Sequence, residues 1–256
     1  MPIRLSLRNL EQYDRDGFII IEDLLDASEV TALCQRLQEY THGGRENEGL
    51  EAQIEPQVLL GELAFEHPGD GIRKIDGLVE HDDLFQGLGL NENIVSVVSQ
   101  IIGGDLKMFR NSLLLKPPGI GSAKGMHQDS AYWPIVPMEL CSCWFALDDA
   151  TTENGCMEVI PGWHKRGALP HQSVTDDYVI PDEHIDYSLK TLAPIKAGGG
   201  LFFHSLLPHC TAPNRSQNRR RAIALSYMAA DSKYTGAGES PVYFPVKGRS
   251  FSGCIR

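Results

Sequence analysis

From Asp105 onward the chain consists of short strand-like runs separated by turns that contain Gly, Pro or Asn. The runs are 106–115, 140–147, 157–160, 201–204, 209–212 and 221–229. Before them, the apolar spacing predicts helices over about 26–40, 82–88 and 93–102. Short strands that follow a helical segment predict a double-stranded β-helix (a cupin-like jelly roll), mainly β within the α+β class and flanked by N-terminal helices.

The chain has 256 residues, which suits a single β-rich domain with a large core. We expect one domain over 1–256, with a helical N-terminal part at about 1–104 and a jelly-roll core at about 105–230. The tail, 231–256, carries aromatic residues and should pack back on the core. Residues 42–56 are polar and acidic, so we expect a flexible loop there.

The formal net charge is −11, which disfavours binding to nucleic acid or to an anionic membrane. The sequence also indicates no basic patch of the kind that would bind a bulky polyanion. No apolar run approaches the roughly 20 residues that span a bilayer. The N-terminus lacks a signal-peptide core, and the six cysteines have no Cys-x-x-Cys spacing. These features favour a cytoplasmic protein, a monomer or homodimer, that acts on a small molecule.

His127 and Asp129 form a candidate metal-binding pair. On an extended chain, side chains two positions apart point to the same side, so this imidazole and carboxylate could share one ion. His-x-Asp is also common by chance, and two ligands do not make a site. A third ligand must come from far along the chain, where His204 and His209 are both available. Two histidines and one carboxylate form the facial triad of non-haem Fe(II) oxygenases.

Several short motifs occur in one order along most of the chain. They are Tyr13–Ile21 with its Asp16-Gly17-Phe18 turn, Lys116-Pro117-Pro118, His127-Gln128-Asp129, Asn154-Gly155-Cys156, Ile160-Pro161-Gly162 and Phe202–His209. Each motif alone is weak, but the ordered set is specific. The chain resembles the phytanoyl-CoA dioxygenase (PhyH) family of Fe(II)- and 2-oxoglutarate-dependent oxygenases.

This resemblance implies a set of site residues. His127, Asp129 and His209 would be the metal ligands and hence the catalytic centre. His209 is preferred to His204 because Arg220 lies at the family's separation from it. The resemblance assigns 2-oxoglutarate to four positions, which are Arg220 for the distal carboxylate, Thr211, Trp144 and Lys74. By strand alternation, Arg219 and Arg221 should face away from that site.

The resemblance also implies a reaction. Fe(II), 2-oxoglutarate and O₂ would support hydroxylation of a small molecule, with release of succinate and CO₂. Related halogenases have a small residue in place of Asp129, so the carboxylate favours oxygenation. The candidate substrate residues are Tyr132 and Trp133, which follow the ligand loop, and Gln128, which should alternate away from the ligands. The alternatives are desaturation, cyclisation or epimerisation of a natural-product intermediate with the same cofactors, and a non-catalytic jelly-roll binding protein.

Overall fold

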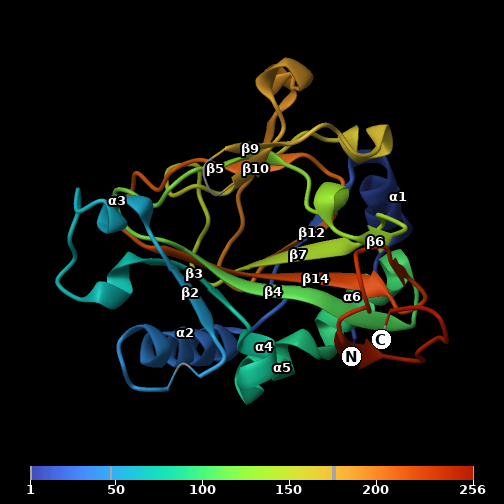
Figure 1. Ribbon diagram of the computed structural model, residues 1–256, viewed down its shortest axis with the longest axis horizontal. Helices are drawn as coiled ribbons and strands as arrows, with labels where there is room; N and C mark the ends of the chain where they lie inside the picture. Colours follow the sequence, from blue (N-terminus) through green and yellow to red (C-terminus); the bar gives the residue numbers. More distant parts are fainter. Residues whose placement is uncertain (1, 47, 175–176, 256) are drawn as a thin grey trace.

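The fold was analysed in a computed structural model that describes residues 2–46, 48–174 and 177–255. Its main element is an antiparallel sheet with the strand order β1-β12-β7-β14-β4-β3-β2, in which β16 also pairs with β4. These strands are β1 (Phe18–Ile21), β2 (Glu51–Ile54), β3 (Ile72–Asp76), β4 (Leu106–Lys116), β7 (Cys141–Ala146), β12 (Gly200–His204), β14 (Arg220–Ala229) and β16 (Phe244–Lys247). Figure 1 shows this sheet running through the middle of the molecule.

A smaller antiparallel sheet lies above the main sheet in Figure 1. Its order is β11-β8-β13-β5, from β5 (Lys124–His127), β8 (Met157–Val159), β11 (Thr191–Ala193) and β13 (His209–Thr211). Two two-stranded antiparallel sheets complete the described strands: β9 (Gln172–Val174) with β10 (Asp177–Val179), and β6 (Ile135–Val136) with β15 (Lys233–Tyr234). Two facing antiparallel sheets confirm the predicted jelly roll.

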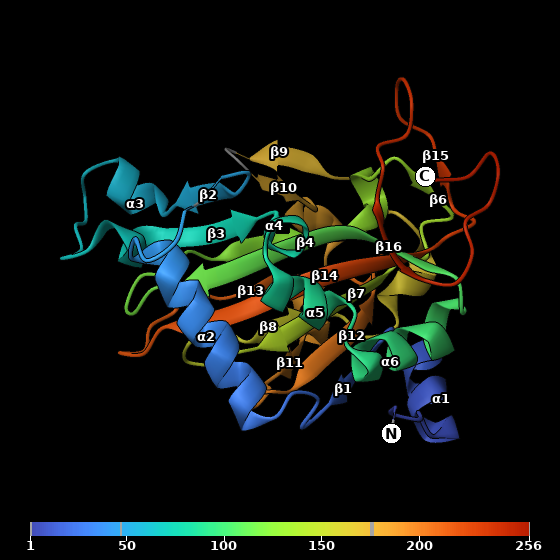
Figure 2. The same ribbon diagram turned by 90° about the horizontal axis from the view of Figure 1, so that it is seen from below.

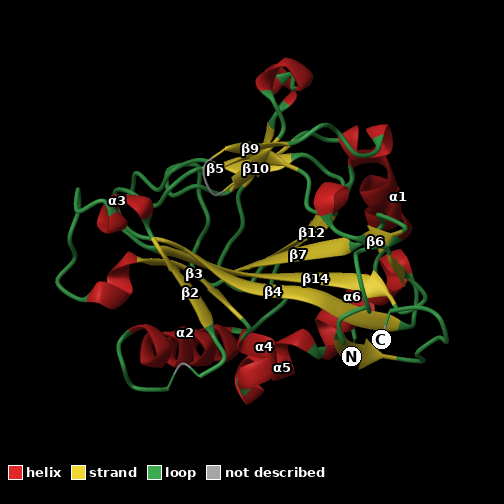
Figure 3. Cartoon of the chain, in the orientation of Figure 1, coloured by secondary structure: helices red, strands yellow, loops and turns green. Residues whose placement is uncertain are grey.

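Helices cover the outer face of the main sheet. The α-helices are α1 (Leu7–Asp16), α2 (Ala27–Thr41), α3 (Pro56–Leu59), α4 (Leu78–His81), α5 (Asp83–Gly89) and α6 (Glu92–Ile102). Short 3₁₀ turns occupy Pro68–Gly71, Ser130–Tyr132, Trp163–Arg166, Asp182–His184 and Tyr187–Leu189. Figures 2 and 3 show α2, α4, α5 and α6 packed against the side of the sheet that faces away from the small sheet. The described part of the chain holds no helix with the length and apolarity to cross a bilayer.

Alternation along β7 separates two apolar layers. Cys143 and Phe145 belong to the core between the main sheet and the helices, which also takes in Leu37 and Val97. Trp144 lies in a second core, between the two sheets. Because neighbouring residues of a strand point to opposite faces, one short strand supplies both layers. The inner layer is the one that meets the candidate site.

Besides its helices, the N-terminal part contributes β1, β2 and β3 to the main sheet. β2 lies within the segment 42–56 that we expected to be a flexible loop. β2 is an edge strand whose residues Glu51, Ala52 and Gln53 are exposed. A polar strand at a sheet edge has no apolar alternation, so composition alone does not distinguish it from a loop. The tail does pack back, since β16 pairs with β4.

Asp82 joins α2 to the start of α5. Its carboxylate accepts hydrogen bonds from the backbone N–H of Leu84 (2.9 Å) and pairs with Arg36 at 2.5 Å. The Tyr40 hydroxyl donates to the same carboxylate at 2.9 Å. Burial acts to raise the pKa of Asp82, but the bonds from Arg36, Tyr40 and the backbone outweigh it and hold this pKa below its usual value.

We predict that Asp82→Asn lowers the free energy of unfolding by about 1–3 kcal/mol, because it removes a helix cap and leaves Arg36 without its charge partner. Asp83→Asn is the matched control, since Asp83 is adjacent and exposed. The folded-state pKa of Asp82 is depressed, so its contribution is complete above the ordinary aspartate pKa and is lost as the pH falls through the folded value. Urea unfolding at neutral pH and at acid pH measures both effects. An equal loss in the two variants would contradict the assignment.

Candidate metal centre

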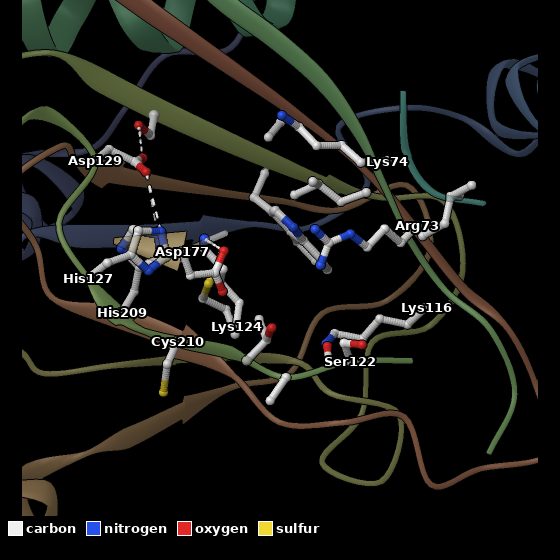
Figure 4. A pocket seen from close by; sticks show the side chains of 18 of the residues that line it. Arg73, Lys74, Lys116, Ser122, Lys124, His127, Asp129, Asp177, His209 and Cys210 are labelled. Carbon is white, nitrogen blue, oxygen red and sulfur yellow. Dashed lines mark hydrogen bonds and ion pairs between the residues drawn. The ribbon is translucent and has the colours of Figure 1, made fainter. Parts of the chain in front are cut away.

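His127, Asp129 and His209 meet in the space between the two sheets. In the antiparallel pairing of β13 with β5, His209 is directly opposite His127. The Nε2 atoms of His127 and His209 lie 3.6 Å and 3.7 Å from Oδ1 of Asp129. One ligand atom from each residue lies within 4.8 Å of the other two, and all three residues are buried. Figure 4 shows the three side chains directed toward one another at one end of a pocket. The sequence-predicted triad is therefore brought together.

Each group of the triad is held by a hydrogen bond on the side away from the centre. Nδ1 of His127 lies 2.8 Å from the carbonyl oxygen of Gly125, and Nδ1 of His209 lies 2.9 Å from that of Leu207. A carbonyl only accepts, so each Nδ1 carries the proton and each Nε2 keeps a lone pair for a metal. The Ser142 hydroxyl donates to Oδ2 of Asp129 at 2.7 Å, which leaves Oδ1 to face both rings.

The protonation state also suits a metal ligand. Burial lowers the pKa of His127 well below its usual value, and the charges of His209 and Lys124 act in the same direction. A neutral imidazole is the form that binds a metal. The centre is thus arranged to hold a divalent cation with two nitrogen ligands and one oxygen ligand.

The local reason for the His127–Asp129 pairing differs from the one the sequence indicated. β5 ends at His127, and Asp129 has helical backbone angles (φ −63°, ψ −54°) at the start of a 3₁₀ turn. The two side chains therefore meet across the end of a strand and not by alternation along it. Apolar patterning does not reveal such a turn, because it depends on two backbone angles of a single residue.

His204 lies outside the triad. Its Nδ1 accepts the backbone N–H of Leu206 at 3.0 Å, and its ring centroid lies 5.1 Å from that of His164. Burial lowers the pKa of His204 to about 4, with a further contribution from His164. A neutral, hydrogen-bonded histidine at the end of β12 is a structural residue, which leaves His209 as the third ligand candidate.

The pocket that contains the triad has a volume of about 360 Å³ and is lined by both sheets. Arg220, at the start of β14, lines it and is only 2% exposed. Its Nε and Nη1 atoms are buried and have no hydrogen-bond partner. Its guanidinium carbon lies 5.1 Å from the ring centre of Trp144. Burial lowers the pKa of Arg220 to about 10, so it remains charged at neutral pH.

The remaining sequence-predicted cosubstrate residues also line this pocket. Thr211 and Lys74 contribute from β13 and β3. Lys74 forms an ion pair with Asp76 at 2.6 Å, and burial lowers its pKa. Arg219 and Arg221 lie outside it and pair with Asp70 and Asp148. Alternation about Arg220 is therefore as predicted.

Two of the three predicted substrate residues, Gln128 and Trp133, do not line the pocket. Gln128 is fully buried and its amide nitrogen donates to the carbonyl oxygens of Gly167 and Leu206, at 2.9 Å and 2.7 Å. Trp133 packs in a separate apolar cluster, with its ring 4.6 Å from that of Phe109. Gln128 is held away from the pocket by these two carbonyl groups, as strand alternation predicted, and Trp133 follows the turn at Asp129, which directs the chain away. The side chain of Tyr132 falls outside the described part of the structure.

Sequence reasoning missed Ser142 and Lys116 as site residues. Ser142 is the polar residue on the inward face of an otherwise apolar strand, and that alternation is a usable signal. Lys116 lines the pocket, and its Nζ donates to the backbone carbonyl of Ser122. Burial, together with a smaller effect of the Arg220 charge, lowers the pKa of Lys116 to about 7.

Comparison with known proteins identifies the chain's family. The pattern of the phytanoyl-CoA dioxygenase (PhyH) family matches residues 13–222. The chain belongs to the phytanoyl-CoA dioxygenase family. Oxygenases of this family depend on Fe(II) and 2-oxoglutarate. The resemblance to this family, and the Fe(II) and 2-oxoglutarate dependence that it implies for the family, are therefore confirmed.

Relatives within and around this family differ in their reactions. Peroxisomal phytanoyl-CoA dioxygenase of Rattus norvegicus is 27% identical over 240 residues, which cover 90% of this chain and 70% of the relative. L-proline trans-4-hydroxylase of Streptomyces griseoviridis is 26% identical over 239 residues, with 84% of each chain covered. The epimerase SnoN, solved with Fe³⁺, α-ketoglutarate and nogalamycin RO, has the same fold, with a TM-score of 0.69, 20% identity and 95% of each chain covered.

The described residues fit both family cofactors. Two imidazoles and one carboxylate suit Fe(II) and leave positions open for further ligands. A buried guanidinium with two unpartnered nitrogens suits a carboxylate, which would accept both hydrogen bonds and neutralise the charge. Arg220 is therefore explained by a small dianion such as 2-oxoglutarate, and no described side chain supplies that carboxylate.

We predict that His209→Gln weakens Co(II) binding by more than about 100-fold, because loss of a ligand should cost more than loss of an outer-shell partner. His204→Gln is the matched control, five residues away on the same Phe202–His209 segment, and should bind Co(II) like the wild type. Absorption of the bound Co(II) measures affinity, and circular dichroism checks folding. If the His204 variant lost the metal and the His209 variant kept it, the ligand assignment would be wrong.

Ser142→Ala should reduce Co(II) affinity by about 10- to 100-fold, since the serine orients the Asp129 carboxylate without touching the metal position. Ser122→Ala is the control, because Ser122 also lines the pocket and its hydroxyl donates to Glu55 and not to Asp129. The same absorption titration gives both affinities. A weakening of equal size in the control would show a general disturbance of the pocket.

Proposed function

We propose that this protein hydroxylates a carbon of a small-molecule substrate in a reaction that consumes 2-oxoglutarate and O₂ and releases succinate and CO₂. The observation that carries the proposal is Arg220. It is charged, buried and unpartnered in the pocket that also holds the triad. A pocket for a metal alone would not require it, and burying an unpaired charge is costly.

The side chains of the pocket would have separate roles in binding the metal and 2-oxoglutarate. His127, Asp129 and His209 would hold iron, and Arg220, with Thr211 beside it in the pocket, would bind the distal carboxylate of 2-oxoglutarate. Iron and 2-oxoglutarate, when bound, supply the chemistry that activates dioxygen. Trp144 and the apolar layer between the sheets keep bulk water from the guanidinium, which strengthens its charge-assisted bonds.

We propose hydroxylation in preference to desaturation, cyclisation or epimerisation, which the same cofactors could also support. It rests on the Streptomyces relative, whose name specifies a hydroxylase and which aligns with 84% of this chain. Asp129 also supports it, because a carboxylate ligand fills the place that a halide would take. SnoN is an epimerase on the same fold, so product analysis has to separate the two outcomes. A purely structural binding role leaves the triad and Arg220 without a purpose.

We predict that the Fe(II)-loaded protein develops a visible charge-transfer band when 2-oxoglutarate is added without oxygen.

Arg220→Gln should weaken 2-oxoglutarate binding by about 10- to 100-fold, as expected for loss of charge-assisted hydrogen bonds of about 1.5–3 kcal/mol, and should leave metal affinity unchanged. Arg219→Gln is the control, since this neighbour pairs with Asp70 outside the pocket.

Activity is tested by screening metabolites for substrate-dependent succinate release, with mass spectrometry of the product. Gain of one oxygen atom identifies hydroxylation, whereas loss of two hydrogens or an isomer of unchanged mass identifies the alternatives. Metal-loaded protein that gives no band and no succinate would exclude 2-oxoglutarate as the cosubstrate. An equal loss of metal and 2-oxoglutarate in Arg220→Gln would show misfolding and not a specific contact.

A further inference from the structure

The pocket is rich in cations, although the whole chain carries a net charge of −11. Its basic lining residues are Arg73, Lys74, Arg110, Lys116, Lys124 and Arg220. Its acidic lining residues are Glu55, Asp129 and Asp177. Cations concentrated in a pocket of an acidic protein attract anionic ligands. The sequence did not indicate this basic patch, because its members come from separate strands and loops.

The lysines of this group already have partners. Lys74 pairs with Asp76, Lys124 pairs with Asp177, and Lys116 donates to a backbone carbonyl. These contacts satisfy the ammonium groups and fix them in the wall.

The two arginines differ from the lysines. Among the described residues neither Arg73 nor Arg110 has a carboxylate partner. Nε of Arg73 is buried with no hydrogen-bond partner, and Nε of Arg110 donates only to the Ser112 hydroxyl, at 3.2 Å. A buried polar atom without a partner is uncommon in a native protein and calls for an explanation such as a bound group.

Arg110 lies within the same electrostatic field as the lysines. Burial is the main cause of the lowered pKa of Lys74, and the charges of Arg110 and Lys124 lower it further. Figure 4 shows Arg73 and Lys74 on the side of the pocket away from the triad, with Lys124 closer to the triad. Arg73 and Arg110 both line this pocket, so they belong to the cavity that a substrate must enter.

The family cofactors do not account for these two arginines. Fe(II) and the Asp129 carboxylate, together with 2-oxoglutarate and Arg220, form a group of charges that balance one another. Lys74 and Lys124 are balanced by their own aspartates. Glu55 accepts a hydrogen bond from Ser122, and its charge acts on Lys116. Arg73 and Arg110 are left as lining cations without an ion-pair partner among the described residues.

We propose that the substrate is an acid whose carboxylate or phosphate group binds in the part of the pocket that Arg73 and Arg110 line. A guanidinium group matches both oxyanions because it donates two parallel hydrogen bonds. This inference rests on the proposed function, since it assigns the part of the pocket that iron and 2-oxoglutarate would leave open. It makes Arg73 and Arg110 specificity residues that choose acids over neutral compounds of the same shape.

The test uses probes too small to be excluded by shape. Wild-type protein is saturated with redox-inert Zn(II) and 2-oxoglutarate, and binding of acetate, acetamide and inorganic phosphate is followed by broadening of their NMR signals. Acetate and acetamide are nearly isosteric, so a difference between them reports charge. We expect acetate or phosphate to bind at least about tenfold more tightly than acetamide, as a charge-assisted contact should. The tighter of the two oxyanions identifies the class of acid.

The Arg73→Gln/Arg110→Gln double variant should lose this preference, and Arg73→Lys/Arg110→Lys should keep part of it. Arg8→Gln, the same change at an exposed arginine of α1, should have no effect. The inference is overturned if wild-type protein does not distinguish acetate from acetamide, or if the double Gln variant still does. Signals of 2-oxoglutarate in the same tubes test the proposed function separately. If they do not broaden, the cosubstrate assignment fails while the acetate result still decides the charge preference.

Discussion

The centre depends on the antiparallel pairing of β13 with β5, which sets His209 directly opposite His127. Each histidine uses Nδ1 to bond the carbonyl oxygen of the residue two positions before it in the chain, so the same local geometry occurs twice. Ser142, on the facing sheet, holds the third ligand, Asp129. Backbone and neighbouring side chains thus orient the ligands in advance, and little conformational entropy remains to be lost when a cation binds.

Burial of the Arg220 charge in this pocket lowers the stability of the folded protein. Arg220 is nearly inaccessible to water, and two of its nitrogens lack partners. Contact with the Trp144 ring recovers part of the lost hydration, because a guanidinium is attracted to an aromatic face. A bound anion would compensate the rest of the lost hydration. Stability is given up at this position in favour of binding, as is common where a functional group must be kept dry.

Sequence reasoning was most accurate where a local period or a fixed spacing carries the information. Alternation about Arg220 predicted which neighbours face away, and the spacing from His209 to Arg220 distinguished His209 from His204. Sequence reasoning was least accurate where the backbone conformation of a single residue sets the direction of the following chain. The helical conformation of Asp129 turns the chain, so Trp133, which follows it, packs in a separate apolar cluster instead of lining the pocket. Sequence reasoning did not predict the cation-rich lining of the pocket, for a different reason. Its residues come together only through the strand order of the sheets, which no short stretch of sequence encodes.

Burial also determines which basic residue type can keep its charge in this pocket. The pKa of Lys116 falls to about 7, first because the amine is desolvated and second because Arg220 is nearby. Since this folded-state pKa lies below that of an exposed lysine, the native state is favoured at high pH, and this stability is lost as the pH falls through about 7. Arg220, with a pKa of about 10 after a comparable desolvation, stays charged at neutral pH. A pocket that must attract anions while excluding water therefore depends on guanidinium groups, and its lysines need either a carboxylate partner, as Lys74 and Lys124 have, or a neutral role.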